Sequence, residues 1–198
     1  MTHPFDRIQA ALRAGGEESS DFDLNPDVKL PPGRVLRPAA VLVAFHETDQ
    51  GMNVLLTKRS SVLKHHPGQI AFPGGKVDDT DKNVFAAALR EAEEEVALPG
   101  RLVDVLGSLP THETVTGYSI TPVLGMIRDS FRPVPSPGEV EEVFTVPFSH
   151  IADPERFQVQ SRVWQGQKRY YYTVPFGPYY IWGATARILR SLAERMAR

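Results

Sequence analysis

The chain has no cysteine, which excludes disulfides, thiolate metal sites and cysteine nucleophiles. It also lacks a long apolar segment: the longest purely apolar run, Ala39 to Phe45, is far too short to cross a bilayer. The N-terminus has neither the basic region nor the apolar region of a secretory signal peptide. We therefore expect a cytoplasmic protein that does not associate with membranes.

An excess of charge of one sign is missing as well. The 198 residues include 22 basic and 24 acidic side chains, without a basic run or a basic aromatic stripe, so the electrostatic footprint of a nucleic-acid-binding protein is absent. With 41% apolar residues, the chain can bury a substantial core. We expect a short amphipathic helix over residues 4–13 within an N-terminal lead-in of residues 1–34, followed by a single domain over residues 35–198.

The most informative stretch is residues 72–98, where a glycine turn and an aspartate-rich loop precede a predicted helix. Positions i, i+3 and i+4 of a helix share a face. Glu91, Glu94 and Glu95 are therefore expected to project together, while Glu93 points elsewhere. Three carboxylates at close range repel one another, but they supply the oxygen ligands that Mg²⁺ or Mn²⁺ requires. The pattern favours a divalent metal site, and a solvated acidic helix face is the alternative.

The residues around the acidic cluster favour the metal site. Residues 72–75, Phe-Pro-Gly-Gly, form a turn in which glycine lets the backbone approach a ligand. Asp81 is placed to cap the helix, and Arg90 can orient a neighbouring carboxylate. Apolar residues give the helix a buried side opposite the acids, and these are Val84, Ala87, Ala88, Ala92 and Val96.

This segment resembles the Nudix box, G-x5-E-x7-R-E-U-x-E-E-x-G-U, in which U is apolar. Gly75 matches the first glycine, Arg90-Glu91-Ala92 matches R-E-U, and Glu94-Glu95 matches the glutamate pair that binds metal in the family. Asp81 replaces the early glutamate and is separated from Arg90 by eight residues rather than seven, and Ala97 replaces the late glycine. A shorter side chain on a longer loop need not reach the metal, so the role of Asp81 stays open.

The preceding residues 55–75 resemble the signature of the coenzyme A diphosphatase branch of the family, approximately L-L-T-x-R-[SA]-x3-R-x3-G-x3-F-P-G-G. The residues in register are Leu55, Leu56, Thr57, Arg59, Ser60, Gly68 and Phe72 to Gly75. Lys64 stands where arginine is usual, which keeps the charge but loses the planar fork. The resemblance implies a substrate-binding set of Arg59, Lys64, Gly68, Phe72, Gly74 and Gly75, in which Arg59 and Lys64 could meet a 3′-phosphate. A solvated basic loop is the alternative.

Alternating or apolar runs predict most of the remaining elements. We expect one hairpin over residues 37–46 and 53–58, a second hairpin over residues 158–174, and strands over residues 101–109, 120–127 and 139–147. A proline-rich extended loop precedes the last of these strands. The chain ends in an amphipathic helix with three inward residues, Ile188, Leu189 and Leu192.

Three further groups are candidates for the site. Glu139 begins a segment that resembles the element carrying a general base or an extra metal ligand in several Nudix enzymes, and a surface glutamate is the alternative. His112 and Glu113 lie in a polar loop that could face the site, although such residues are more often simply exposed. One of the three tyrosines at 170–172 could stack on an adenine, although aromatic residues in strands mostly pack.

The resemblance implies an α/β fold, the Nudix α/β/α sandwich with a mixed β-sheet. It implies that Glu91, Glu94 and Glu95 hold Mg²⁺ or Mn²⁺, and that coenzyme A or its thioesters are hydrolysed to 3′,5′-ADP and (acyl-)4′-phosphopantetheine. Arg90 would fix Glu91, and Glu139 would deprotonate water. The alternatives are a Nudix hydrolase of ADP-ribose, NADH or dinucleoside polyphosphates, and a non-catalytic nucleotide sensor, which would be expected to lose metal ligands that are intact here. The oligomeric state stays open.

Overall fold

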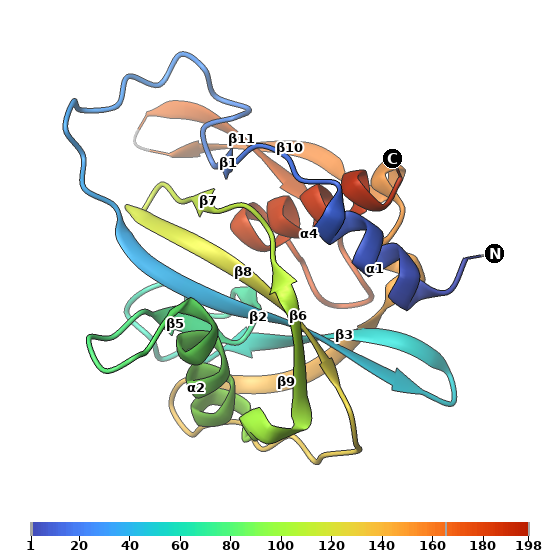
Figure 1. Cartoon of the computed structure of the whole chain (residues 1–198). Coiled ribbons are helices and arrows are strands. Elements are labelled where there is room, and N and C mark those ends of the chain that lie inside the picture. The colour runs from blue at the N-terminus through green and yellow to red at the C-terminus, as the bar shows by residue number, and fades with distance from the viewer. Residues whose placement is uncertain (1, 165, 198) are drawn as a thin grey trace.

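A mixed β-sheet lies between helices in the computed structural model, which describes residues 2–164 and 166–197 (Figure 1). Helix α2 (Val84–Val96) covers one face, and helices α1 (Pro4–Arg13) and α4 (Gly183–Met196) cover the other. The predicted α/β/α sandwich with a mixed sheet is confirmed. Short helical segments are α3 (Phe148–Ile151), η1 (Gly100–Leu102) and η2 (Pro154–Arg156).

The sheet is organised around the long strand β2, which pairs in parallel with β8 and antiparallel with β3 and β5. Within the described residues the main sheet has nine strands. They are β1 (Ser19–Ser20), β2 (Arg37–Thr48), β3 (Gly51–Arg59), β4 (Ile70–Ala71), β5 (Gly74–Lys76), β6 (Val103–Ser108), β7 (His112–Glu113), β8 (Tyr118–Ile127) and β9 (Val140–Pro147). Strands β4 and β9 pair with β3, β6 and β7 pair with β8, and β1 extends β7 in parallel.

Two hydrophobic cores follow from the alternation of side chains along β2. Ala40, Leu42 and Ala44 pack under α2, whereas Val43 and Phe45 belong to the core under α1 and α4. Because successive side chains of a strand point to opposite faces, one strand serves both cores. Small residues on both sides, the alanines of β2 and those of α2, let the acidic helix lie close to the sheet. This packing fixes the position of the glutamates.

Most elements predicted from the periodicity are confirmed, with some corrections at their ends. The helix over residues 4–13, the hairpin of β2 and β3 and the C-terminal helix are present. The strand expected from residue 101 begins only after the 3₁₀ turn η1. Asp81 does not cap α2: the N-cap is Asn83, whose side chain accepts a hydrogen bond of 3.0 Å from the Ala86 N–H, because Asn83 directly precedes the first helical residue.

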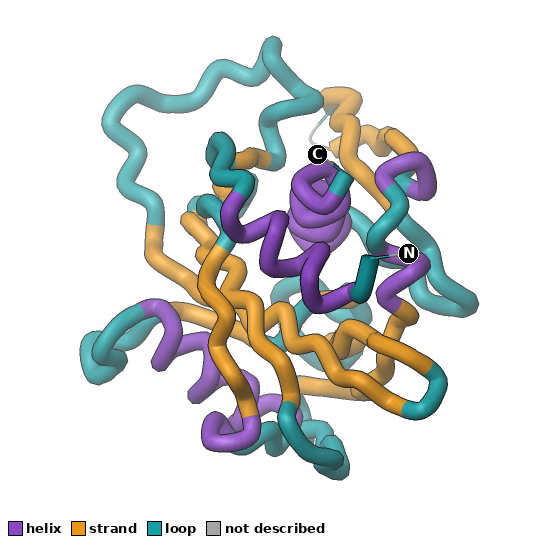
Figure 2. The backbone as a smooth tube through the Cα atoms, turned by 45° about the vertical axis from the view of Figure 1, so that its right-hand side comes forward, coloured by secondary structure: helices purple, strands orange, loops and turns teal. Residues whose placement is uncertain are grey.

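The second predicted hairpin, β10 (Gln158–Trp164) and β11 (Gln167–Thr173), forms its own two-stranded sheet next to α4. The connection from β1 to β2 arches away from the main sheet (Figure 2). It is tied to the hairpin by Asn25, whose side-chain amide donates 2.9 Å to the Tyr170 carbonyl and accepts 2.9 Å from the Tyr170 N–H. No helix among the described residues is long and apolar enough to span a membrane.

Candidate active site

Arg90, in the middle of α2, organises the acidic residues around it. Its Nε and Nη2 donate 3.0 and 2.9 Å to the two carboxylate oxygens of Asp81, and its Nη1 donates 3.0 Å to Glu91 and 3.1 Å to Glu94. Hydrogen bonding to Arg90 holds the pKa of Asp81 below its usual range. Asp81 is therefore the partner that fixes Arg90, and both of its oxygens are already engaged by the guanidinium.

Glu95 is the most buried of the glutamates, with 5% of its surface exposed. The Gly74 N–H donates 3.2 Å to Oε2, and Nη1 of Arg59 lies 3.8 Å from Oε1. Burial raises the pKa of Glu95 to about 7, and the charges of Glu91 and Glu139 act in the same direction, against the opposing effects of Gly74 and Arg59. A carboxylate so poorly solvated gains from a cation placed beside it.

Glu91 lies against the glycine turn that precedes the helix. A Cβ atom added at Gly75 would overlap the Glu91 carboxylate, so only glycine permits this approach. Burial is also the main cause that raises the pKa of the Glu91 carboxyl, although its hydrogen bond from Arg90 acts in the opposite sense. The glycine turn therefore positions two glutamates of α2: the Gly74 N–H binds Glu95, and Gly75 leaves space for the Glu91 carboxylate.

The basic segment after β3 folds back beside Glu95. Arg59, the last residue of β3, donates its N–H to the Gln69 carbonyl at 3.0 Å and accepts from the Gly68 N–H at 3.1 Å. Gly68 has a positive φ of 68°, a backbone conformation that favours glycine. Lys64 is exposed on this loop, whereas the side chain of Phe72 is buried in the core and so positions the turn without being available to a ligand.

The proline-rich loop before β9 docks on the C-terminal end of α2. The prolines at 133, 135 and 137 alternate with residues that keep their N–H groups. Val134 donates 3.1 Å to the Val96 carbonyl, and Ser136 donates 2.8 Å to the Glu95 carbonyl. These bonds satisfy carbonyls that have no partner within the helix. Glu139 follows, exposed, with its carbonyl accepting 2.8 Å from the Ser60 N–H. The alternation of prolines was the available sequence signal for this contact.

Comparison with known proteins agrees with this arrangement. A family model, the NUDIX domain, matches residues 35–166. The protein named Uncharacterized Nudix hydrolase NudL of Enterobacter sp. (strain 638) is 43% identical over 165 residues, covering 79% of this chain and 81% of its own. Its counterpart in Escherichia coli O7:K1 is 45% identical over 157 residues, with the same shares covered. This chain belongs to the Nudix family.

Solved structures show the same fold at low sequence identity. A MutT protein from Methanosarcina mazei Go1 superposes with a TM-score of 0.52 at 18% identity, covering 85% of this chain and 97% of its own. A MutT/nudix family protein from Enterococcus faecalis gives a TM-score of 0.51 at 14% identity, covering 100% and 75%. Membership of the family makes this protein a Nudix hydrolase, a hydrolase of the pyrophosphatase type.

Nudix hydrolases generally use divalent ions such as Mg²⁺ or Mn²⁺, and the donor set here fits such an ion in chemistry. Glu91 and Glu95 are two desolvated carboxylates, and the charge of Glu91 adds to the effect of burial in raising the pKa of Glu95. Glu94, however, is exposed and turned toward Arg90, and Glu93 is exposed too. In residues 2–164 and 166–197, no three acidic or histidine side chains are arranged to hold a metal ion. Glu91 and Glu94 both reach Nη1 of Arg90, whereas Glu95 is buried beside Gly74, so the three glutamates do not form a metal-binding group in this conformation.

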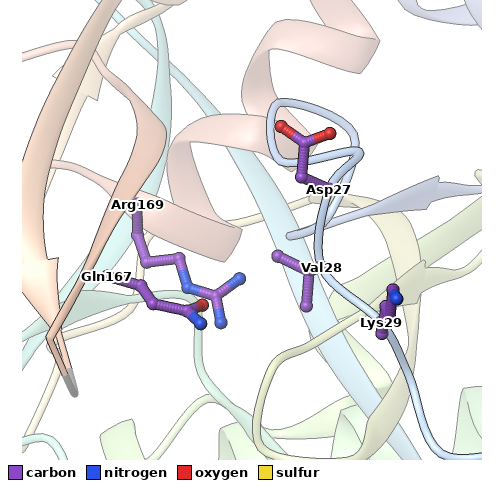
Figure 3. A pocket seen from close by; sticks show the side chains of 5 residues that line it. All are labelled: Asp27, Val28, Lys29, Gln167 and Arg169. Carbon is purple, nitrogen blue, oxygen red and sulfur yellow. The ribbon is translucent and has the colours of Figure 1, made fainter.

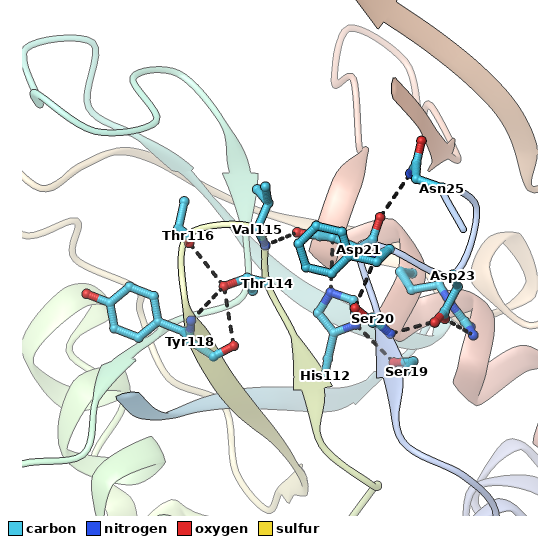
Figure 4. Close-up of polar contacts among 12 residues, drawn as sticks. Ser19, Ser20, Asp21, Asp23, Asn25, His112, Thr114, Val115, Thr116 and Tyr118 are labelled. Atoms are coloured by element: carbon cyan, nitrogen blue, oxygen red, sulfur yellow. Dashed lines mark hydrogen bonds and ion pairs between the residues drawn. The ribbon is translucent and has the colours of Figure 1, made fainter. Parts of the chain in front are cut away.

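His112 and Glu113, in strand β7, do not face the Nudix site. His112 is fully buried, with Nδ1 2.9 Å from Ser19 Oγ and Nε2 3.2 Å from Asp21 Oδ1 (Figure 4). Glu113 is paired with Arg34. Because the Ser19 hydroxyl is itself buried, this Ser–His–Asp set fastens the lead-in to the sheet instead of presenting a nucleophile. The expectation for these two residues was wrong because their partners lie far away in the sequence.

The three tyrosines of β11 have different surroundings. The ring of Tyr172 is covered by Arg190, whose Cζ lies 4.5 Å from the ring centroid, and it packs next to the core under α4. Tyr170 is bound through its backbone to Asn25. Tyr171 contacts Trp182 edge to face, with ring centroids 5.1 Å apart. Packing therefore accounts for Tyr172, and Tyr171 is the tyrosine that contacts another half-buried aromatic side chain, Trp182.

Proposed function

We propose that this Nudix hydrolase cleaves the diphosphate of coenzyme A or its thioesters, giving 3′,5′-ADP and (acyl-)4′-phosphopantetheine, with residues 35–198 as its catalytic domain. The observation that carries the proposal is the position of Arg59. This residue belongs to the segment that resembles the coenzyme A branch, and its guanidinium lies 3.8 Å from Glu95 of the metal-binding helix. The substrate signature and the Nudix box therefore contribute to one site.

Glu91 and Glu95 would hold Mg²⁺ or Mn²⁺, and Glu94 would join them after leaving Arg90. The ion would supply charge neutralisation at the diphosphate and a bound water of lowered pKa. Arg90 keeps Glu91 oriented through its 3.0 Å hydrogen bond, and Asp81 keeps Arg90 in place. The backbone of Gly74 and Gly75 would lie close to the ion or the diphosphate, since the Gly74 N–H already binds Glu95 and Gly75 lies against the Glu91 carboxylate.

The remaining residues would handle the substrate and the attacking water. Arg59 and Lys64 offer positive charge to the anionic substrate, with Arg59 able to bind a phosphate through two N–H groups. Glu139 is the candidate general base: its charge is felt at Glu95, and its exposed carboxylate can accept a proton from water directly or through a second water molecule. Gly68 and Phe72 hold the loop and the turn in register for these groups.

The test is product analysis by mass after separate incubations with coenzyme A, ADP-ribose, NADH and a diadenosine polyphosphate, each with Mg²⁺ or Mn²⁺. The proposal expects coenzyme A to be cut fastest, with 3′,5′-ADP and phosphopantetheine as products. Faster cleavage of another compound would overturn the assignment of coenzyme A as the substrate, but it would not affect the proposed role of the glutamates of α2. No cleavage of any compound would favour the nucleotide-sensing alternative.

A further inference from the structure

The hairpin of β10 and β11 has an unbalanced charge. Residues 158–173 contain Arg162, Lys168 and Arg169 but no aspartate or glutamate. Arg162 and Arg169 are directly opposite each other in the antiparallel register, so their side chains leave the hairpin on the same face. Like charges at such a position are destabilising. Within the part of the chain that the structure describes, no carboxylate forms an ion pair with either arginine, which leaves both charges for a ligand.

Arg162 lies on an aromatic surface. Its Cζ lies over the indole of Trp182, 4.3 Å from the ring centroid, and Arg162 is exposed. Tyr171 contacts the same indole at 5.1 Å, and its hydroxyl lies 3.3 Å from that of Tyr180. A guanidinium held over an indole and exposed on its other side can stack a nucleobase.

Arg169 faces a hollow of about 360 Å³ between the hairpin and the lead-in, lined also by Asp27, Val28, Lys29 and Gln167. Figure 3 shows Arg169 and Gln167 extending from β11 toward Val28. The Nε of Arg169 is buried, and no described residue accepts a hydrogen bond from it. With Lys29 on the opposite wall, the hollow presents two cations and one acid, Asp27, to whatever enters it.

Short contacts connect this surface to the proposed catalytic residues. Gln69 Nε2 lies 3.8 Å from the position that a Cβ of Gly183 would take, and Gly183 follows Trp182 directly. The Gln69 carbonyl accepts from the N–H of Arg59, and Arg59 lies beside Glu95. A second bond of 3.0 Å, from Thr185 Oγ1 to the Ile70 carbonyl, fixes the start of α4 to the same segment.

We propose that this face of the hairpin is the subsite for the nucleoside end of the diphosphate substrate. The base stacks on the guanidinium of Arg162, above Trp182, and a phosphate on the ribose lies between Arg162 and Arg169. The inference rests on the proposed function for the identity of the substrate. Any adenine nucleotide with a phosphate apart from the scissile diphosphate has the required chemistry.

The test measures binding and turnover separately. Calorimetric titration with adenosine 3′,5′-bisphosphate and with 4′-phosphopantetheine, without divalent metal, is made on the wild type and on Arg162→Ala, Arg162→Lys and Arg169→Ala. Arg162→Ala should lower the affinity for adenosine bisphosphate by about tenfold or more, because a surface on which the base stacks is lost. The affinity for phosphopantetheine should not change. Arg162→Lys should recover little, because lysine keeps the charge but cannot stack. Arg13→Ala, which removes an exposed charge at the end of α1, is the matched control.

Comparing the turnover of coenzyme A with that of dephospho-coenzyme A, which lacks the phosphate on the ribose, shows which residues bind that phosphate. Arg169→Ala should raise the KM of coenzyme A more than that of dephospho-coenzyme A and leave kcat unchanged. Unchanged affinity for adenosine bisphosphate in both alanine variants would overturn the subsite. The same conclusion would follow if Lys64→Ala, and neither arginine variant, raised the KM of coenzyme A more than that of dephospho-coenzyme A. These results are independent of which substrate is cut fastest, since the calorimetry needs no hydrolysis. Melting temperatures equal to the wild type verify that the variants are folded.

Discussion

Glu95 is the single residue on which the proposed chemistry depends most. Its carboxylate is buried between Gly74 and Arg59, and no cationic side chain among the described residues donates a hydrogen bond to it. Glu95→Gln keeps the shape and can still accept from the Gly74 N–H, but it removes the ligand charge. We expect turnover to fall by on the order of 1000-fold or more, because metal-assisted stabilisation of the transition state is lost. The measurement is kcat at saturating Mg²⁺, and Glu93→Gln, on an exposed part of the same helix, is the control. Near-normal turnover would refute the assignment of Glu95.

The burial of Glu95 also makes the stability of the metal-free protein depend on pH. The pKa of Glu95 is raised by burial from 4.5 to about 7 in the folded protein, so the folded state binds more protons than the unfolded state between these values. Stability of the metal-free protein therefore decreases as pH rises through this window. Glu95→Gln should stabilise the metal-free protein by up to about 3 kcal/mol at pH 8, and by much less at pH 5.

The check is urea unfolding in the presence of a chelator at the two pH values. A gain from Glu95→Gln that is equal at pH 5 and pH 8 would contradict an origin in the buried charge. Adding Mg²⁺ should stabilise the wild type but not the variant, because only the wild type keeps both carboxylates.

At the scale of elements, the site depends on how the proline-rich loop meets α2. The bonds from Val134 and Ser136 to the last helical carbonyls dock this loop on the end of α2, and Glu139, which follows, is near enough for its charge to contribute to the raised pKa of Glu95. If Glu139 is the general base, Glu139→Gln should lower kcat by about 100-fold or more with little change in KM. Steady-state kinetics test this. Glu141→Gln, which removes the charge of an exposed carboxylate that pairs with Lys58 and hydrogen-bonds with Ser61, should be near normal, and an equal loss in both variants would argue against a base at Glu139.

The elements were predictable where the information is local. The apolar spacing of Val84 to Val96 predicts α2, and alternation predicts β2, β9 and both hairpins. Competition between neighbours was harder to foresee. Glu94 shares a helical face with Glu91, but it also lies four residues after Arg90, and the ion pair with Arg90 prevails in this conformation. Asp81 and Asn83 are both capping residues by type, and only the geometry decides between them.

At the scale of the whole molecule, long-range contacts of the lead-in escaped sequence reasoning. His112 gives no local sign that it binds Ser19 and Asp21, and Asn25 gives none that it binds Tyr170. His112 is 93 and 91 residues away from Ser19 and Asp21 in the sequence, and Asn25 is 145 residues away from Tyr170. They nevertheless bring the lead-in against the main sheet and the hairpin, which places Lys29 across the hollow from Arg169.

Asn25 is the test of this tie, because its amide forms two hydrogen bonds with the backbone of Tyr170 and a third with the Asp21 carbonyl. Asn25→Ala removes the partner of half-buried backbone groups in both segments, at a cost of about 1 kcal/mol. We expect a lower melting temperature and faster tryptic cleavage after Lys29, which is exposed on the released segment. Asn53→Ala, which removes an amide from the turn between β2 and β3, should leave cleavage after Lys29 unchanged. If Asn25→Ala is cleaved there no faster than the wild type, the other contacts of the lead-in, such as those of His112 and the Asp23–Arg187 pair, hold it in place, and the hollow beside Arg169 does not need the Asn25 bond.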